Sequence, residues 1–217
     1  MEILLLRHFE SKKNINRSFS SKDNQEVLTE YGINVGKNVA QNIFDYIKNK
    51  EHVVERIYCA DSIRAKQSAQ IIANKIGVSI ETDKNLLSNN SGQLLGKTEN
   101  EAVRINPLFM EQLKLYRTGI FSSYDFVKVF EREDKHEFEQ RVNNSMQNIL
   151  YDGFETLKIV VLHHSSLTAF IIDFARKNYN YPDNFYGRVD CDLGNVFLLN
   201  DDKILLCNEP SNKLLSV

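Results

Sequence analysis

The sequence predicts an α/β protein built in three layers, with a mostly parallel central sheet and helices on both faces. Short apolar runs without polar alternation, at residues 3–6 and 158–162, are typical of strands buried on both faces. Segments with apolar residues at helical spacing lie between the strands, as at residues 35–47. Strands and helices therefore alternate along the chain, which favours parallel strands joined by helices.

The expected elements follow from turn and cap signals as well as from periodicity. Thr29 is a plausible N-cap for the first helix, and Gly77 a plausible C-cap residue for a helix that ends near Ile76. Pro107 breaks a helical pattern over residues 99–117. The remaining strands are expected at 53–58, 78–81, 196–199 and 204–207, two further helices at 134–150 and 164–174, and loops at 9–27 and 85–98.

Composition bounds the protein class. A chain of 217 residues, 42% hydrophobic and 26% charged, fits one globular domain over residues 1–217 that folds without metal or disulfide. A net charge of -2 without a dense basic run argues against nucleic-acid binding. Cys59, Cys191 and Cys207 are too few and too scattered for a disulfide framework, so we expect buried thiols in a reducing compartment. No signal peptide or membrane span is expected, which favours the cytoplasm, and nothing predicts an oligomeric state.

Polar side chains stand where three of the predicted strands end. The first strand runs into Arg7 and His8, the second leads to Arg64, and the strand at 158–162 runs into His163 and His164. Carboxyl ends of parallel strands share one edge of a sheet, where ligands bind. Arginine forks match phosphate oxygens, and a neutral imidazole can attack phosphorus. A lone histidine or arginine is usually structural, so only their convergence would indicate a phosphate-handling site.

The first of these blocks resembles the opening of the histidine phosphatase superfamily, which includes the cofactor-dependent phosphoglycerate mutases. That family has a strand followed by Arg-His-Gly-Glu-Ser/Thr and often Asn, and residues 4–14 here read LLLRHFESKKN. Phe9 stands where the family usually has glycine. The matching residues are Arg7, His8, Glu10, Ser11 and Asn14.

Later blocks resemble the same family in the same order. LTEYG at 28–32 is similar to its Leu-Thr-x-x-Gly, and IYCADSIRAKQSAQIIA at 57–73 places Arg64 as the second phosphate-binding arginine. Glu133 begins a segment similar to Glu-Ser-x-x-x-Phe-x-x-Arg-Val. KIVVLHHSSLTAF at 158–170 is similar to the strand that precedes the second catalytic histidine.

The register of the last block leaves two histidines open. Aligning Leu167 and Ala169 on the family pattern makes His163 the second catalytic histidine and puts His164 in place of a glycine. The other register makes His164 the catalytic residue. The resemblance further implies that His8 is the nucleophile, that Arg7, Arg64, His163 and Asn14 bind the phosphoryl group, and that no metal or cofactor is needed.

The usual proton donor is missing from the pattern. The family has a glutamate four residues before a glycine, and NLLSNNSGQLLG places Ser88 at that position. A serine is no acid at neutral pH, and loss of general acid catalysis costs roughly 10²–10⁴-fold in rate. Two substitutes are conceivable: His164 as an imidazolium, or Glu133, whose counterpart lies near the pocket. Equally, His164 could have only a structural role, packing at the end of the predicted strand.

The sequence thus favours a phosphomonoesterase acting on a small phosphorylated metabolite through a phosphohistidine. The alternative from another class is a phosphate-binding or interaction protein that kept the fold and lost turnover, which the missing donor motivates. A phosphoglycerate mutase is disfavoured, because Arg104 and Arg117 stand alone where mutases carry an arginine-rich segment.

Overall fold

A six-stranded sheet in the order β3-β2-β4-β1-β5-β6 forms the centre of the computed structural model. Strands β3, β2, β4 and β1 are mutually parallel, while β5 runs antiparallel to β1 and pairs with β6 in an antiparallel hairpin. The mostly parallel sheet is therefore confirmed. The strands are β1 (Glu2–Arg7), β2 (Arg56–Ala60), β3 (Ser79–Asp83), β4 (Leu157–Leu162), β5 (Val196–Asn200) and β6 (Lys203–Cys207). The structure describes residues 2–20, 25–111, 131–153, 156–179, 189, 191–200 and 203–207.

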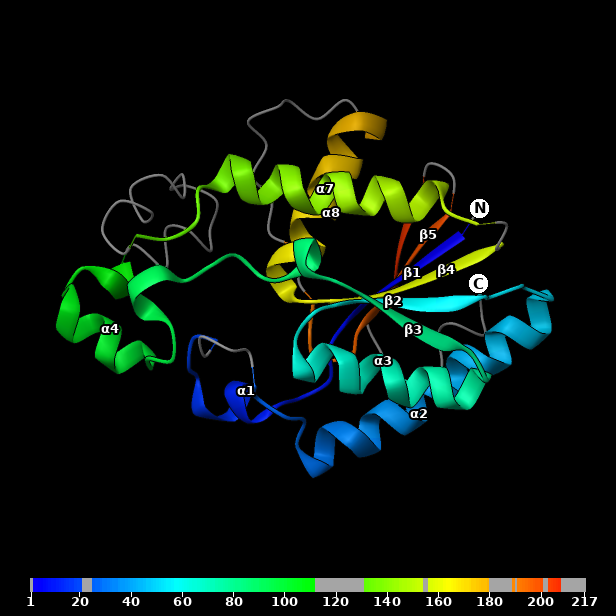
Figure 1. Ribbon diagram of the computed structural model, residues 1–217, viewed down its shortest axis with the longest axis horizontal. Helices are drawn as coiled ribbons and strands as arrows, with labels where there is room; N and C mark the ends of the chain where they lie inside the picture. The colour runs from blue at the N-terminus through cyan, green and yellow to red at the C-terminus, as the bar shows by residue number, and fades with distance from the viewer. Residues whose placement is uncertain are drawn as a thin grey trace.

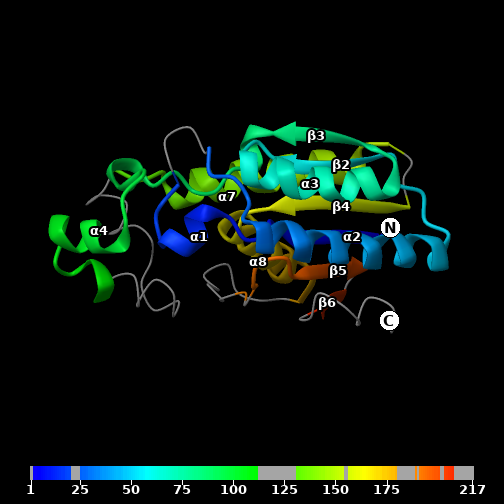
Figure 2. The same cartoon turned by 90° about the horizontal axis from the view of Figure 1, so that it is seen from below.

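Helices cover both faces of the sheet, as predicted. The helices are α1 (Lys12–Asn16), α2 (Glu30–Lys50), α3 (Ile63–Ile76), α4 (Glu99–Ile105), α7 (Lys135–Tyr151) and α8 (His164–Tyr179), with short 3₁₀ turns at Lys84–Leu86 and Gly92–Leu94. Figure 1 shows α2 and α3 together on one face and α7 and α8 on the other. Helices α1 and α4 lie beyond the carboxyl ends of the parallel strands (Figure 2).

The sequence patterns explain why these segments adopt these structures. All six residues of β4 are buried, as are the central four of β1, which agrees with runs that lack polar alternation. Helix α2 begins where the Thr29 hydroxyl accepts a hydrogen bond from the Gly32 N–H at 2.9 Å. Helix α3 ends at Gly77, whose φ of 87° is the left-handed conformation that glycine adopts without strain.

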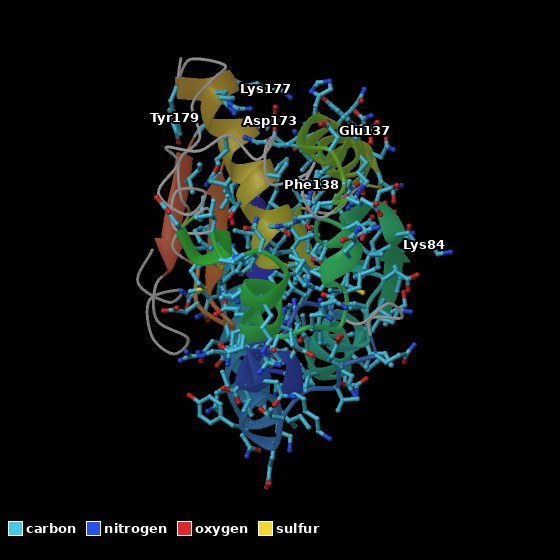
Figure 3. All side chains as sticks on the ribbon, turned by 90° about the vertical axis from the view of Figure 1, so that its left-hand side faces the viewer. Lys84, Glu137, Phe138, Asp173, Lys177 and Tyr179 are labelled. Carbon is cyan, nitrogen blue, oxygen red and sulfur yellow. The ribbon has the colours of Figure 1, made fainter. Side chains whose placement is uncertain are left out.

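Helices α7 and α8 pack against each other and carry their charges outward. Phe138 and four other residues of α7 are buried, while Glu137 on the same helix is exposed. Near the end of α8 the Lys177 ammonium lies 2.6 Å from the Asp173 carboxylate (Figure 3). This face therefore buries one apolar stripe per helix and exposes ion pairs that contribute little to stability.

Two expectations about elements need correction. Residues 9–27 are not all loop, because α1 forms within them. The second strand was expected to include Val53, but β2 begins at Arg56, and the Val53 carbonyl instead accepts hydrogen bonds from the N–H groups of Thr156 and Leu157. The expected break at Pro107 is confirmed, because helix α4 ends at Ile105. The rest of that helical expectation, beyond residue 111, lies outside the described residues.

The described thiols are buried and free. Burial raises the pKa of Cys59 and of Cys191 to about 12, so both stay protonated at neutral pH. The Cys207 side chain lies outside the description. Within the described ranges, no helix is long and apolar enough to cross a membrane, and no cluster of ligand-type side chains has the geometry of a metal site.

Phe9, the departure from the family glycine, is accommodated by two glycines of this chain. Its ring is 1% exposed and lies against Gly36 of α2 and Gly194 of the segment before β5. A Cβ on Gly36 would lie 2.7 Å from the ring, and one on Gly194 would lie 3.0 Å from it. Gly194 also has a φ of 79°. Because glycine has no side chain, Gly36 and Gly194 together leave the space that the Phe9 ring fills.

Replacing Gly36 by Ala is expected to destabilise the protein, although Gly→Ala inside a helix normally stabilises by up to about 1 kcal/mol. The new methyl would overlap a buried ring that has no room to move, at a cost of about 1–3 kcal/mol. Urea unfolding measures the change. Asn38→Ala on the exposed side of the same helix is the control and should be neutral or slightly stabilising. A Gly36→Ala variant more stable than wild type would contradict the packing described for Phe9.

Candidate active site

His8 and His163 meet at the carboxyl ends of two neighbouring parallel strands. Arg7 at the end of β1 pairs with Leu162 at the end of β4, and the His8 N–H donates to the Leu162 carbonyl at 3.0 Å. The two imidazole ring centroids are 5.2 Å apart with the rings edge to face. Each histidine is only 3% exposed. The convergence expected from a parallel topology is present.

The hydrogen bond of His8 defines which ring nitrogen is free. Nδ1 lies 2.8 Å from the carbonyl oxygen of Phe9. A carbonyl only accepts, so Nδ1 must carry the proton in that bond. In the neutral ring, Nε2 then keeps an unshared electron pair, which is the requirement for a nitrogen nucleophile.

His163 has the opposite tautomer, set by Arg64. An Arg64 guanidinium nitrogen, NH2, lies 3.3 Å from His163 Nδ1, and since a guanidinium only donates, Nδ1 is the acceptor. His163 Nε2 therefore carries the proton and donates to the Ser62 hydroxyl at 3.2 Å. Ser62 is also the N-cap of α3, the helix that carries Arg64. His163 thus uses its one N–H in the bond to Ser62, while its ring lies edge to face with that of His8.

Arg64 is a fully buried guanidinium held on three sides. Besides His163, it donates to the Glu26 carboxylate at 2.9 Å and to the Ser20 hydroxyl at 3.1 Å. Arg7 donates to the Cys191 carbonyl at 2.6 Å. Among the described residues, the Nε–H groups of both arginines are buried without a hydrogen-bond partner. Two orphaned buried cationic donors beside the histidine pair are suited to an anion.

Both histidines are held neutral. Burial is the largest cause and lowers the pKa of each well below 6.5, and the positive charge of Arg64 lowers both further. The Phe9 carbonyl opposes this at His8, and the positive charges of Arg7 and Lys13 reinforce it at both. At neutral pH the His8 Nε2 lone pair is therefore available for attack.

Stability is expected to decline as the pH falls below about 6.5. The unfolded chain protonates its histidines near that pH, whereas the folded pKa values of His8 and His163 are lower, so the unfolded state binds more protons. The slope reaches about 1.4 kcal/mol per pH unit for each histidine. Urea unfolding at pH 7.5 and 5.5 measures it. A His163→Asn variant should lose about half of the decrease, and an unfolding free energy as high at pH 5.5 as at 7.5 would contradict the neutral pair.

Comparison with known proteins agrees with this geometry. Residues 3–196 match the family model of the histidine phosphatase superfamily, branch 1, which is most of the chain. The chain belongs to that superfamily. It is 28% identical over 176 residues to the phosphoglycerate mutase-like protein 4 of Arabidopsis thaliana, covering 81% of this chain and 71% of the relative.

Solved structures of this superfamily share the fold at low sequence identity. The mycobacterial glucosyl-3-phosphoglycerate phosphatase in complex with VO3 superposes with a TM-score of 0.71 at 14% identity, over 97% of this chain and 99% of that one. The phosphoglycerate mutase of Bacillus anthracis str. Sterne superposes with a TM-score of 0.70 at 18% identity, over 100% of this chain and 95% of that one.

Several residues of the histidine phosphatase motifs hold the site together and do not face it. The Glu10 carbonyl accepts a hydrogen bond from the Thr29 N–H at 3.0 Å, and a Cβ on Gly32 would lie 2.2 Å from the same oxygen. The Ser68 hydroxyl accepts from the Phe9 N–H at 3.0 Å and donates to the Arg64 carbonyl at 2.7 Å. The segment around His8 is thereby fixed to the helices that carry Arg64 and the Leu-Thr-x-x-Gly motif.

Asn14, expected at the phosphate, is engaged in a helix cap. Its side-chain oxygen accepts hydrogen bonds from the Ser11 N–H at 3.0 Å and the Ser11 hydroxyl at 2.6 Å, which closes a capping box at the start of α1. The contacts of Asn14 in this structure are thus local. Its oxygen organises the short helix that follows the His8 segment.

The structure separates the two histidines of the last block. His163 is the residue beside His8, whereas His164 is the first residue of α8, and its Nε2 donates to the Val189 carbonyl at 3.1 Å. Glu133 also has fixed partners. Its carboxylate receives two hydrogen bonds from Arg141, at 2.6 and 2.8 Å, and one from the Asn90 N–H at 2.9 Å.

Ser88 lines a polar cleft whose wall includes Ser20, a hydrogen-bond partner of Arg64. The cleft has a volume of about 510 Å³. Lys84 at its rim extends away from the body of the molecule (Figure 3). Its lining comprises Ser20, Lys84, Leu87, Ser88, Asn89, Asn90, Leu95, Glu131, Arg132, Glu133 and Arg141. A polar leaving group would find hydrogen-bonding partners there.

Three site residues were not predicted from the sequence: Ser20, Glu26 and Ser62. Ser62 had a signal, because it stands at the junction before a predicted helix and caps it. Ser20 and Glu26 sit in a segment predicted only as loop. Their approach to Arg64 depends on how that segment folds back over α3, which no periodicity encodes.

Proposed function

We propose that this chain is a phosphomonoesterase that transfers a phosphoryl group from a small phosphorylated metabolite to His8 and then to water. The observation that carries the proposal is the buried pair His8 and His163 beside two arginines whose Nε–H groups lack partners among the described residues. Its shape and charge fit a phosphate. Both phosphatases and a mutase occur among the neighbours, so the hydrolytic outcome is our inference.

In the first proposed step, Nε2 of neutral His8 attacks phosphorus. The N–P bond forms as the ester P–O bond breaks, and the departing oxygen takes up a proton. The Phe9 carbonyl stabilises the charge that develops on the imidazole through the Nδ1–H bond. Arg7 and Arg64 would balance the charge on the equatorial oxygens, and the His163 Nε2–H would join them by exchanging its bond to Ser62 for one to a phosphoryl oxygen.

In the second proposed step, water attacks the phosphohistidine. A new P–O bond forms, the N–P bond breaks, and His8 recovers its electron pair while phosphate leaves. The water loses its proton to the group that protonated the leaving oxygen, in accordance with microscopic reversibility. No metal or cofactor is proposed for these steps.

Hydrolysis of an aryl phosphate with excess chelator present tests the proposal. Release of both the phenol and inorganic phosphate, undiminished by chelator, is the expected result. Absence of turnover, with inorganic phosphate still raising the melting temperature, would instead support a phosphate-binding protein that lost catalysis. Transfer of phosphate between positions of phosphoglycerate without release of inorganic phosphate would indicate a mutase.

Ser88→Glu is expected to speed the hydrolysis of alkyl phosphates, whose leaving groups need a proton, by roughly 10²-fold or more. The carboxyl group would enter the cleft that reaches Arg64 through Ser20. An aryl phosphate should change little, because its leaving group departs without protonation. Comparing kcat for the two ester types measures the effect. Ser88→Gln is the matched control, since it adds the same volume without an acid.

The same pair of substrates tests the proposed donors of the natural chain. If His164 supplies the proton, His164→Ala slows the alkyl ester much more than the aryl ester, and equal losses on both would argue against it. Glu133 is the weaker proposal, because the Arg141 guanidinium and the Asn90 N–H already bond to both oxygens of its carboxylate. If Ser88→Glu hydrolyses the alkyl ester no faster than Ser88→Gln does, the idea that Ser88 limits turnover is refuted.

A further inference from the structure

Ser62 carries a buried hydroxyl beside the second histidine of the site. The residue follows β2 as the N-cap of α3 and is only 2% exposed. Its hydroxyl oxygen lies 3.2 Å from His163 Nε2 and 3.4 Å from the backbone nitrogen of Ala65, and these are its two partners among the described residues. The amino end of α3 therefore lies against His163, where the helix dipole favours an anion.

Both partners of the Ser62 hydroxyl act as donors toward it. The Ala65 N–H can only donate. His163 Nε2 also carries a proton, because Nδ1 of the same ring accepts from the Arg64 guanidinium at 3.3 Å. The hydroxyl oxygen therefore accepts two hydrogen bonds, while its own O–H has no acceptor within the part of the chain that the structure describes. A buried donor of this kind is open to an acceptor from outside the chain.

The Ser62 O–H is the third open donor in this part of the site. The Nε–H groups of Arg7 and Arg64 are also buried without a partner among the described residues. Arg64 follows Ser62 by two positions on α3, and Arg7 pairs with the last residue of β4, directly before His163. Two of the three donors are cationic, so together they suit an anion that presents several oxygens.

We propose that the Ser62 hydroxyl donates a hydrogen bond to an oxygen of the phosphoryl group and is a further phosphate-binding residue of the site. The inference rests on the proposed function, since its acceptor is the group that His8 attacks. When the His163 Nε2–H exchanges its bond for one to a phosphoryl oxygen, the Ser62 oxygen loses one donor, and its O–H can rotate toward the same group. The N-cap position holds the hydroxyl at this place.

Calorimetric titration with inorganic phosphate tests the role of Ser62. Ser62→Gly removes the hydroxyl but keeps a residue that caps helices nearly as well. At pH 7 it should bind phosphate roughly 10- to 100-fold more weakly than wild type, as expected for loss of a hydrogen bond to a charged group. Thr98→Gly is the matched control, because it removes the capping hydroxyl of α4, and it should bind phosphate as wild type does. Urea unfolding confirms that each variant is folded.

A double variant separates direct contact with the phosphate from an effect through His163. His163→Ala removes the imidazole to which Ser62 bonds and keeps both arginines, so phosphate should still bind, more weakly. Adding Ser62→Gly to that variant should weaken binding again by about the same factor, because the hydroxyl contacts the phosphate itself. Equal affinity of the single and double variants would overturn the inference, since Ser62 would then act only by positioning His163.

Failure of this inference is distinguishable from failure of the proposed function. If wild type binds phosphate and Ser62→Gly binds it equally well, the hydroxyl plays no part, while the proposed function stands. If Ser62→Gly binds phosphate more tightly, the hydroxyl competes with phosphate for the His163 N–H, and the inference is wrong. If wild type binds no phosphate at all and Arg7→Met is the same, the phosphoryl site itself is wrong, and the assignment of Ser62 falls with it.

Discussion

Replacing His8 by Asn should reduce hydrolysis of an aryl phosphate by roughly 10⁴- to 10⁶-fold, since the reaction then lacks the nitrogen that forms the intermediate. The amide of Asn can still donate to the Phe9 carbonyl, so the buried segment keeps its hydrogen bond. Affinity for inorganic phosphate should persist, because both arginines remain. Single-turnover assays with enzyme in excess measure this loss of rate directly, because each enzyme molecule reacts at most once.

His136→Asn is the matched control for that variant. His136 is an exposed histidine in the first turn of α7, and its replacement should leave turnover unchanged. A His8→Asn protein that keeps more than about one-hundredth of wild-type activity would show that the phosphoryl group takes a route that avoids His8.

Replacing Arg64 by Met should reduce both activity and stability, for separable reasons. Activity should fall by about 10³-fold or more, because a preorganised donor for the transition-state charge is lost. Removing one partner of a buried ion pair such as Arg64–Glu26 costs about 3–5 kcal/mol. Urea unfolding and kcat/KM measurements report the two effects independently.

The double variant Arg64→Met with Glu26→Gln distinguishes these contributions. A neutral glutamine at position 26 is not a buried charge that requires a cation beside it. The unfolding free energy should therefore recover in part while activity stays low. Recovery of activity together with stability would contradict the role of Arg64 at the phosphoryl group, because it would make the activity loss a consequence of unfolding.

The layered fold was predictable because its strongest segments have unambiguous patterns. The apolar runs that became β1 and β4 are too short for helices and lack polar alternation, and Thr29 and Gly77 mark a helix start and a helix end. Helix α1 was missed because Lys12–Asn16 has no apolar periodicity. It forms through the side-chain bonds between Ser11 and Asn14 and its tether to Val27, which are properties of the folded chain.

The site was predictable where it depends on strand ends. Arg7, His8 and His163 follow directly from two parallel strands, whose register fixes their proximity. The ambiguity between His163 and His164 could not be resolved from the sequence, since it depends on where β4 stops and α8 begins. The helix turns His164 toward the Val189 carbonyl and leaves His163 facing His8.

Trapping the covalent intermediate tests the central claim most directly. Enzyme mixed with excess aryl phosphate is quenched in alkali, which preserves phosphohistidine, and the phosphorylated residue is located by peptide mass spectrometry. We predict a phosphoryl group on His8, formed within the first turnover and absent from His8→Asn. Turnover with no phosphorylated residue, or with the phosphoryl group on His163 or any residue other than His8, would contradict the account.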